Sequence, residues 1–113
     1  MKQLEIVDAP CCAVTDGALI AADRARHLAE SFKALSDPTR VRLLRHIAGS
    51  EDATACACHL PDLLGISQPT LSHHMQKLVR AGLVDREQRG RWAHYTVRPG
   101  AIDALRTFLD DAV

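Results

Sequence analysis

The chain has 113 residues, 47% of them hydrophobic, which suits one compact domain and excludes a second independent core. Its formal net charge is zero, so the net charge gives no argument for nucleic-acid binding. No stretch approaches the roughly 20 apolar residues that cross a bilayer, and the first residues lack the apolar run of a signal peptide. We therefore expect a cytoplasmic protein without a membrane partner.

The first part of the chain differs from the rest. Residues 1–20 show no sustained hydrophobic period, and we interpret them as a flexible N-terminal arm that carries Cys11 and Cys12. Residues 21–113 should form a single DNA-binding and dimerisation domain. It begins with an amphipathic helix, because apolar residues recur there at helical spacing: Ala25, Leu28, Ala29, Phe32 and Leu35.

A second helix follows at once. Asp37 is a good N-cap, Pro38 is a good first helical residue, and Gly49 suits the position after the helix end. We expect this helix to bury the apolar side formed by Val41, Leu44, Ile47 and Ala48.

The middle of the chain predicts a helix-turn-helix. A short helix with Leu60, Leu63 and Leu64 on one face stops at Gly65, and Ser67 caps the next helix. That helix should point four apolar side chains inward: Leu71, Met75, Leu78 and Val79.

The C-terminal third predicts a β-hairpin and a last helix. Residues 83–88 and 91–97 flank a turn at Gly90 and favour strands, and Pro99 begins the final helix. We take Trp92 and Tyr95 as packing residues of the hairpin, and His27, His46 and His94 as structural. The predicted fold is mainly α with a small β-hairpin, a winged helix-turn-helix.

The second helix of this motif carries the residues expected to read DNA. With its apolar face in the core, Gln68, Ser72 and His73 lie outward, where they can reach base edges in a major groove. Thr70 and Gln76 suit phosphates, and Arg89 and Arg91 at the hairpin tip suit phosphates or a narrow minor groove. A polar helix face or an Arg-Gly-Arg turn alone is often only solvated surface. Their combination in this order favours binding to double-stranded DNA.

The four cysteines form two close pairs, Cys11–Cys12 and Cys56–Cys58. Thiolates are soft ligands that favour Cd(II), Pb(II), Cu(I) or trivalent arsenic and antimony over hard ions. Residues as close as Cys56 and Cys58 do not favour a relaxed disulfide, but they can converge on one ion. Two thiolates are too few, so the arm should supply the others. Taken singly, each pair could be inert, with Cys58 as a small buried residue. His59 could be a fourth ligand, although a surface role suits it better.

These residues resemble the ArsR/SmtB family of metal-sensing repressors, most closely its arsenite-responsive members. The resemblance covers residues 29–97 and is carried by the segments 32–40, 56–60, 67–75, 81–84 and 90–95. It implies a homodimer built on the first and last helices, in which the ligand-free protein represses transcription and a ligand releases it. It also implies that Cys56 and Cys58 begin the family's thiolate site, which the arm cysteines of the other protomer complete.

Two departures from the family pattern refine this expectation. The last segment has no histidine for the family's zinc site, and Pro61 stands where arsenite sensors often place a third cysteine. The adjacent Cys11–Cys12 pair resembles arsenite sensors more than cadmium sensors. We expect As(III) or Sb(III) to bind Cys56, Cys58 and at least one of Cys11 and Cys12.

Three alternatives remain open. A Cd(II)/Pb(II) sensor would use all four thiolates, and a thiol-redox sensor would form a disulfide. A thiol enzyme would need a cysteine held in a pocket with a base and a resolving partner, and the sequence predicts no such pocket. We therefore expect that the protein is not an enzyme.

Overall fold

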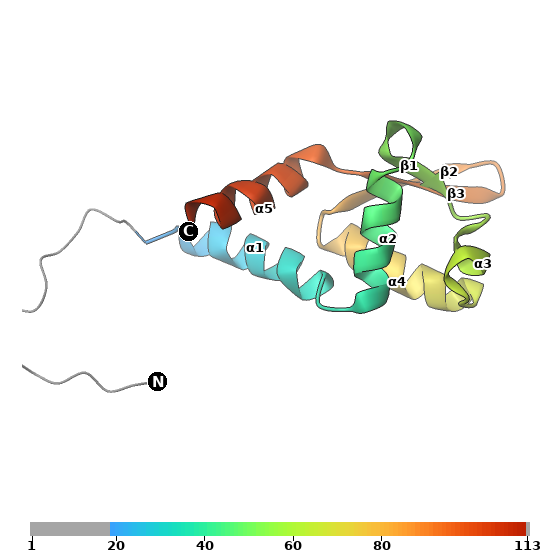
Figure 1. Cartoon of the computed structure of the whole chain (residues 1–113), viewed down its shortest axis with the longest axis horizontal. Helices are drawn as coiled ribbons and strands as arrows, with labels where there is room; N and C mark the ends of the chain where they lie inside the picture. The colour runs from blue at the N-terminus through green and yellow to red at the C-terminus, as the bar shows by residue number, and fades with distance from the viewer. Residues whose placement is uncertain (1–18, 113) are drawn as a thin grey trace, which may run out of the picture.

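The computed structural model describes residues 19–112 (Figure 1). The helices are α1 (Ala22–Ala34), α2 (Pro38–Ala48), α3 (Leu60–Leu64), α4 (Gln68–Arg80) and α5 (Pro99–Asp111), with a 3₁₀ turn at Glu51–Ala53. The strands are β1 (Thr54–Cys56), β2 (Val84–Arg89) and β3 (Trp92–Val97). This order confirms the predicted winged helix-turn-helix. Within residues 19–112, no helix is long and apolar enough to cross a membrane.

The sheet has one strand more than the predicted hairpin. The antiparallel order is β1-β3-β2, and β1 pairs Thr54, Ala55 and Cys56 with residues 96, 95 and 94 of β3. The Thr54 and Thr96 hydroxyl oxygens lie 2.9 Å apart across this pair. Three residues are too few to show an alternating pattern, so β1 is visible only through its pairing partner.

The helix starts follow the local chemistry of the sequence. The Asp37 carboxylate accepts hydrogen bonds from the amides of Thr39 at 2.8 Å and Arg40 at 3.2 Å, and Pro38 opens α2. The Ser67 hydroxyl accepts one from the Thr70 amide at 3.3 Å at the start of α4. Both N-caps are therefore confirmed.

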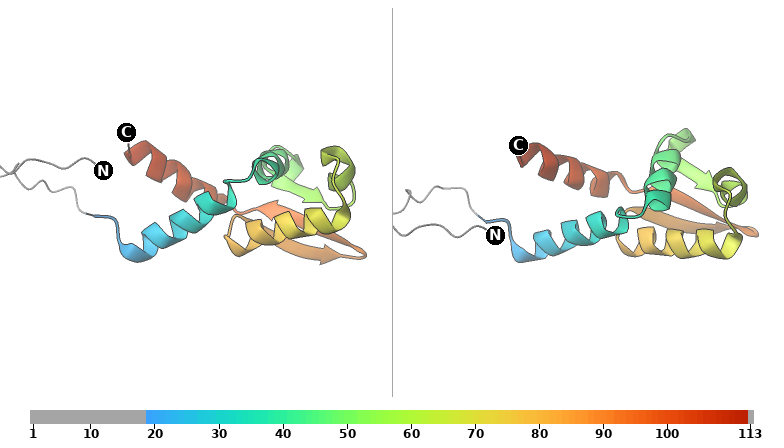
Figure 2. Two further views of the ribbon diagram at one scale, coloured as in Figure 1. Left: turned by 90° about the horizontal axis from the view of Figure 1, so that it is seen from below. Right: turned by 60° about the horizontal axis from the view of Figure 1, so that its bottom comes forward.

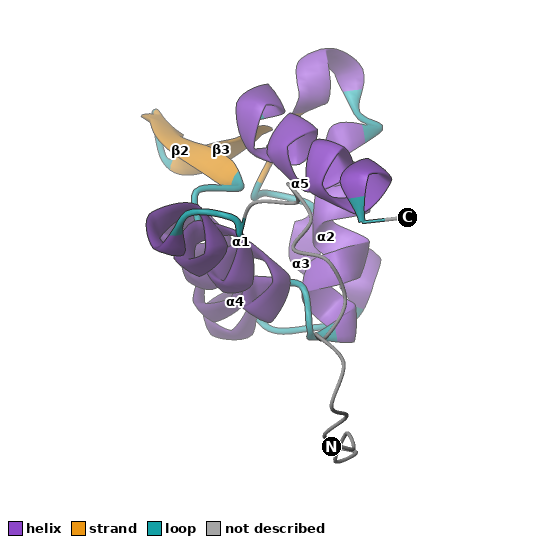
Figure 3. Ribbon diagram, turned by 90° about the vertical axis from the view of Figure 1, so that its left-hand side faces the viewer, coloured by secondary structure: helices purple, strands orange, loops and turns teal. Residues whose placement is uncertain are grey.

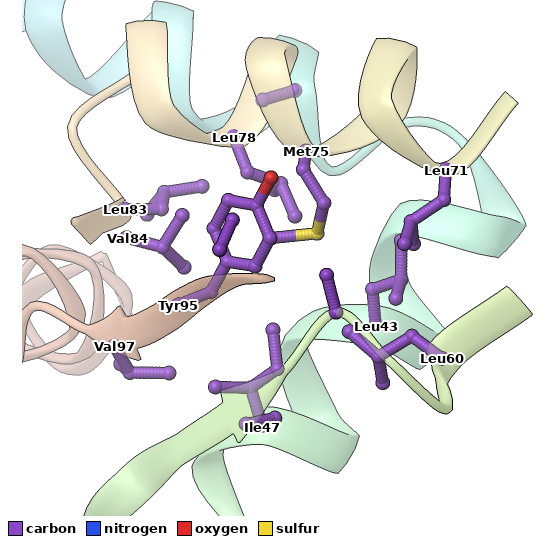
Figure 4. Packing of buried hydrophobic residues seen from close by; sticks show 14 of the residues in the cluster. Leu43, Ile47, Leu60, Leu71, Met75, Leu78, Leu83, Val84, Tyr95 and Val97 are labelled. Carbon is purple, nitrogen blue, oxygen red and sulfur yellow. The ribbon is translucent and has the colours of Figure 1, made fainter. Parts of the chain in front are cut away.

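The core lies between α2, α3, α4 and the sheet. Figure 4 shows Met75 and Leu78 of α4 beside Tyr95 of β3. Eight side chains are almost fully buried: Leu43, Ile47, Leu60, Leu71, Met75, Leu78, Leu83 and Val84. The predicted inward face of α4 is confirmed for three of its four members, and Val79 is half-buried.

The predicted apolar side of α2 is partly wrong. Leu43 and Ile47 are buried, whereas Val41 is 47% exposed and Ala48 is exposed. The helix packs on β3 and α4, and those contacts select a face rotated toward Leu43. A helix with apolar residues on more than one side does not indicate which of them meets its neighbours.

Helices α1 and α5 lie side by side at one end of the molecule (Figures 1 and 2). Phe32 and Phe108 meet edge to face, with ring centroids 5.8 Å apart. Leu28 and Leu105 are buried, but Ala25 and Ala29 of the predicted α1 face are exposed. The same end exposes Leu19, Ile20 and Leu109. Contacts within one chain therefore bury only part of the apolar surface at this end.

Candidate nucleic-acid interface and thiol site

The outer face of α4 is polar and open. All five residues predicted to read DNA from this helix are exposed: Gln68, Thr70, Ser72, His73 and Gln76. The helix begins at Gln68, three residues after Gly65 of the turn, and its N-terminal half carries four of the five. A helix presented in this way has the geometry that enters a major groove.

The hairpin tip presents the two predicted arginines. Arg89 and Arg91 are exposed and flank Gly90, whose φ of +64° lies in the left-handed region. Arg89 Nε donates a hydrogen bond to Glu87 Oε1 at 2.7 Å, which partly neutralises its charge. Arg91 has no ion pair within residues 19–112, so it is the freer of the two to meet a phosphate.

Helix α4, which we call the recognition helix, and the β2–β3 hairpin enclose a groove of about 1050 Å³. Its lining includes residues that the sequence analysis did not select for DNA contact: Arg80, Arg86, Gln88 and Trp92. Arg86 Nη2 donates to Gln88 Oε1 at 2.7 Å, and Gln88 Nε2 donates to the Gly90 carbonyl at 3.0 Å. Trp92, which the sequence analysis assigned to packing, lines this groove and is 38% exposed. The two-residue alternation along β2 could have placed Arg86 and Gln88 on one face.

Arg40 connects three elements near the recognition helix. Its Nε donates to the Ala34 carbonyl at the end of α1 at 2.6 Å, and its Nη1 lies 3.2 Å from His74 Nδ1 on α4. His74 Nδ1 lies 3.9 Å from the Asp37 carboxylate. Desolvation acts to raise the pKa of Asp37, but the amides of Arg40 and Thr39, with the nearby charges of His74 and Arg40, outweigh it and lower that pKa. The start of α2 is therefore tied to the orientation of α4.

Cys56 and Cys58 meet directly before the helix-turn-helix. The structure joins them as a disulfide with Cα atoms 5.3 Å apart, a pairing that the sequence analysis did not favour in relaxed form. Cys56 ends a strand and Cys58 lies in the turn that follows, so the chain folds back enough to bring the two Cα atoms into the range of bridged cysteines. The same convergence would let two reduced thiolates chelate one soft ion.

Polar atoms surround these sulfurs. The Cys58 amide donates to Cys56 Sγ at 3.1 Å, and His59 Nδ1 lies 3.3 Å from Cys58 Sγ. Cys56 also stands opposite His94 across the sheet, and the His94 Nδ1 atom is buried without a hydrogen-bond partner. In the reduced state, the amide that donates to Cys56 Sγ would stabilise negative charge on that sulfur, which suits a thiolate ligand.

The thiol site is not complete within residues 19–112. No group of three or more His, Cys, Asp or Glu side chains in that part of the chain is placed to hold a metal ion. Cys11 and Cys12, the other two predicted ligands, lie outside the described residues. The structure thus brings together one of the two predicted cysteine pairs.

Comparison with known proteins decides the family. A family model described as a helix-turn-helix domain matches residues 35–87. An uncharacterised HTH-type transcriptional regulator of Methanocaldococcus jannaschii is 36% identical over 74% of this chain and 91% of its own length. The arsenical resistance operon repressor of Staphylococcus xylosus is 36% identical over 75% of this chain and 79% of its own length. The chain belongs to the ArsR/SmtB family of transcriptional regulators.

Solved structures of this family share the fold. The AntR antimony-specific transcriptional repressor matches with a TM-score of 0.66 and 26% identity, over 88% of this chain and 92% of its own. A homodimeric winged helix-turn-helix DNA-binding domain from Mycobacterium bovis matches with a TM-score of 0.66 and 19% identity, over 90% of each chain. As an ArsR/SmtB protein, this chain is a DNA-binding regulator and not an enzyme.

Proposed function

We propose that this ArsR/SmtB protein is a cytoplasmic homodimeric repressor that releases its operator when As(III) or Sb(III) binds Cys56, Cys58 and at least one of Cys11 and Cys12. The observation that carries this proposal is the convergence of Cys56 and Cys58 immediately before α3 and the recognition helix. A ligand held there would lie at the start of the helix-turn-helix, whose second helix is α4.

The uncovered end formed by α1 and α5 supports a dimer. Phe32 is 37% exposed and Leu109 is 52% exposed, although both are large apolar residues on neighbouring helices. A second copy placed against this end would bury them, and would set two recognition helices at a fixed separation. The homodimeric Mycobacterium bovis domain of the same fold assembles in pairs.

The donor set supports a thiophilic ligand. Trivalent arsenic takes three thiolates in a pyramid, of which Cys56 and Cys58 would supply two and the arm the third. Both must be reduced to bind, as a reducing cytoplasm provides. An allosteric coupling of about 1 to 3 kcal/mol between ligand and DNA changes operator affinity roughly 5- to 150-fold, which suffices for release.

Operator release tests the proposal. A DNA duplex is first selected from a random pool with wild-type protein under reducing conditions, and its binding is then titrated with arsenite, antimonite, Cd(II), Pb(II) and Zn(II). We expect arsenite and antimonite to release the wild type but not Cys56→Ser/Cys58→Ser protein. Cys11→Ser and Cys12→Ser, each alone, show which arm thiol contributes. Release of the double variant by arsenite would overturn the proposed site.

The same titration addresses the cadmium and lead alternative. A four-thiolate site would respond best to Cd(II) or Pb(II), would show thiolate-to-metal absorption in the ultraviolet, and would lose that response when any one of the four cysteines is replaced. A ligand count of three sulfurs with arsenite would contradict it.

The disulfide favours a second candidate function, a thiol-redox switch. Here Cys56 and Cys58 would lose two protons and two electrons to an oxidant such as hydrogen peroxide, which is reduced to water as the S–S bond forms. Operator affinity should then change with peroxide and return with dithiothreitol in the absence of any metalloid. Mass spectrometry that finds both thiols reduced after peroxide treatment would exclude this candidate.

A further inference from the structure

A second hollow, of about 290 Å³, lies beside the C-terminal end of α4. We call it the basic hollow. Three helices contribute its charged residues: Glu30 and Lys33 of α1, Arg40 of α2, and Lys77 and Arg80 of α4. Four cations thus gather around a single carboxylate.

The four cations of the basic hollow are not neutralised by ion pairs with described residues, although the charge of Arg40 lies close enough to the Asp37 carboxylate to help lower its pKa. Arg26, Arg89, Arg98 and Arg106 each form an ion pair with a carboxylate. No such pair involves the four cations of the basic hollow within residues 19–112. Like charges held close together repel one another, and an anion between them would offset that repulsion.

Helix ends explain only part of the cluster. Lys33 lies in the last turn of α1, and Lys77 and Arg80 lie in the last turn of α4, where cations stabilise the helix dipole. Arg40 lies in the first turn of α2, where the dipole disfavours a cation. Its guanidinium instead donates to the carbonyl of Ala34, which also lines the hollow, and lies 3.2 Å from His74 Nδ1.

The basic hollow adjoins the proposed DNA groove. Arg80 lines both, so the two hollows share a wall at the end of α4. Figures 2 and 3 show α1, α4 and the β2–β3 hairpin on one side of the molecule, with α2, α3 and α5 on the other. A duplex lying along α4 and the hairpin would therefore run on past the basic hollow.

We propose that the basic hollow binds a backbone phosphate of the DNA, which extends the interface from the α4–hairpin groove onto α1. The proposal rests on the DNA-binding part of the proposed function and is independent of the thiol site. Because phosphates are the same in every sequence, the contact should strengthen binding to all duplexes equally.

The salt dependence of DNA binding tests this proposal. Each phosphate contact contributes about 0.9 to the slope of log affinity against log salt concentration, which is about an 8-fold change in affinity for each tenfold change in salt concentration. We expect Lys33→Gln and Arg80→Gln to lower the slope by about 0.9 per protomer, on a random-sequence duplex and on the selected operator alike. Arg106→Gln, which removes a paired cation from α5 on the other side of the molecule, is the matched control and should leave the slope unchanged.

A gain of affinity provides a test that misfolding cannot imitate. Glu30→Gln removes the one carboxylate of the hollow and should tighten binding roughly 3-fold, the effect of one unit charge at about 6 Å in water. Unchanged slopes for Lys33→Gln and Arg80→Gln, or weaker binding by Glu30→Gln, would overturn the proposal.

Free anions are the other source of the same chemistry. Calorimetry with inorganic phosphate at matched ionic strength should show no stoichiometric binding. Such binding, lost in Lys33→Gln while the DNA slope stays unchanged, would assign the hollow to a free anion and overturn the DNA contact. A wild type that binds no duplex would overturn the proposed function as well, before any variant is compared.

Discussion

Replacing Gly65 tests how the turn between α3 and α4 is built. Gly65 has φ +68° and ψ 35°, the left-handed conformation, and a Cβ added there would meet nothing within 4 Å. A substitution therefore acts through the backbone and not through a clash. An L-residue in this region costs about 1–2 kcal/mol, partly offset by about 0.4–1 kcal/mol from the restricted unfolded chain. We expect Gly65→Ala to lower the free energy of unfolding by about 1 kcal/mol.

The assay is urea unfolding at fixed protein concentration, since dimerisation makes apparent stability concentration-dependent. In thermal unfolding the same change corresponds to a midpoint lowered by about 4–8 °C. Gly100→Ala is the matched control, because a Cβ there also meets nothing but the backbone is not left-handed. It should be neutral or stabilising. Gly65→Asn should fall between the two, since Asn tolerates the left-handed region. Equal stability of Gly65→Ala and Gly100→Ala would refute this reasoning.

Three further predictions concern the core, acid stability and sequence reading. Met75 is completely buried, so Met75→Ala should destabilise the fold by about 2–5 kcal/mol in urea unfolding, whereas Gln76→Ala on the exposed face should stay within about 0.5 kcal/mol. The folded-state pKa of Asp37 is lowered below 3.8, so its contribution to stability is complete above that pH and is lost as the pH falls through the lower folded value. Asp37→Asn should reduce the acid dependence of the urea midpoint between about pH 5 and pH 2, and an undiminished slope would contradict the cause given. Gln68→Ala should relax discrimination at one base pair by about 1–3 kcal/mol across single-base variants of the selected duplex, whereas Arg91→Gln should weaken all of them equally.

Much of the proposed DNA interface could be predicted because it lies on single elements. The period of α4 and the burial of Leu71 and Met75 together place Gln68 and His73 outside, whatever the helix packs against. The remaining groove residues, such as Arg80 and Trp92, line it from two elements that are joined only in the folded chain. A sequence pattern within one segment carries no sign of such a shared cavity.

The thiol site divides in a similar way. The pair Cys56–Cys58 could be selected from its spacing and from the softness of sulfur. The strand that ends at Cys56 could not be predicted from the local sequence, because β1 forms only through its pairing with β3, about 40 residues later in the chain. That pairing also puts His94 opposite Cys56, a neighbour that nothing in the local sequence indicates.

By itself, the sequence determined where most helices begin and end, where the chain turns, and which face of α4 is polar. These features depend on hydrogen bonds and backbone preferences within three or four residues, such as the caps at Asp37 and Ser67 and the left-handed glycines at 65 and 90. Only the tertiary structure decided that α2 buries Leu43, that Arg40 reaches His74, and that four cations from three helices share one hollow. Each of these follows from packing between distant segments, where several arrangements satisfy the same local pattern and burial of the common core selects one.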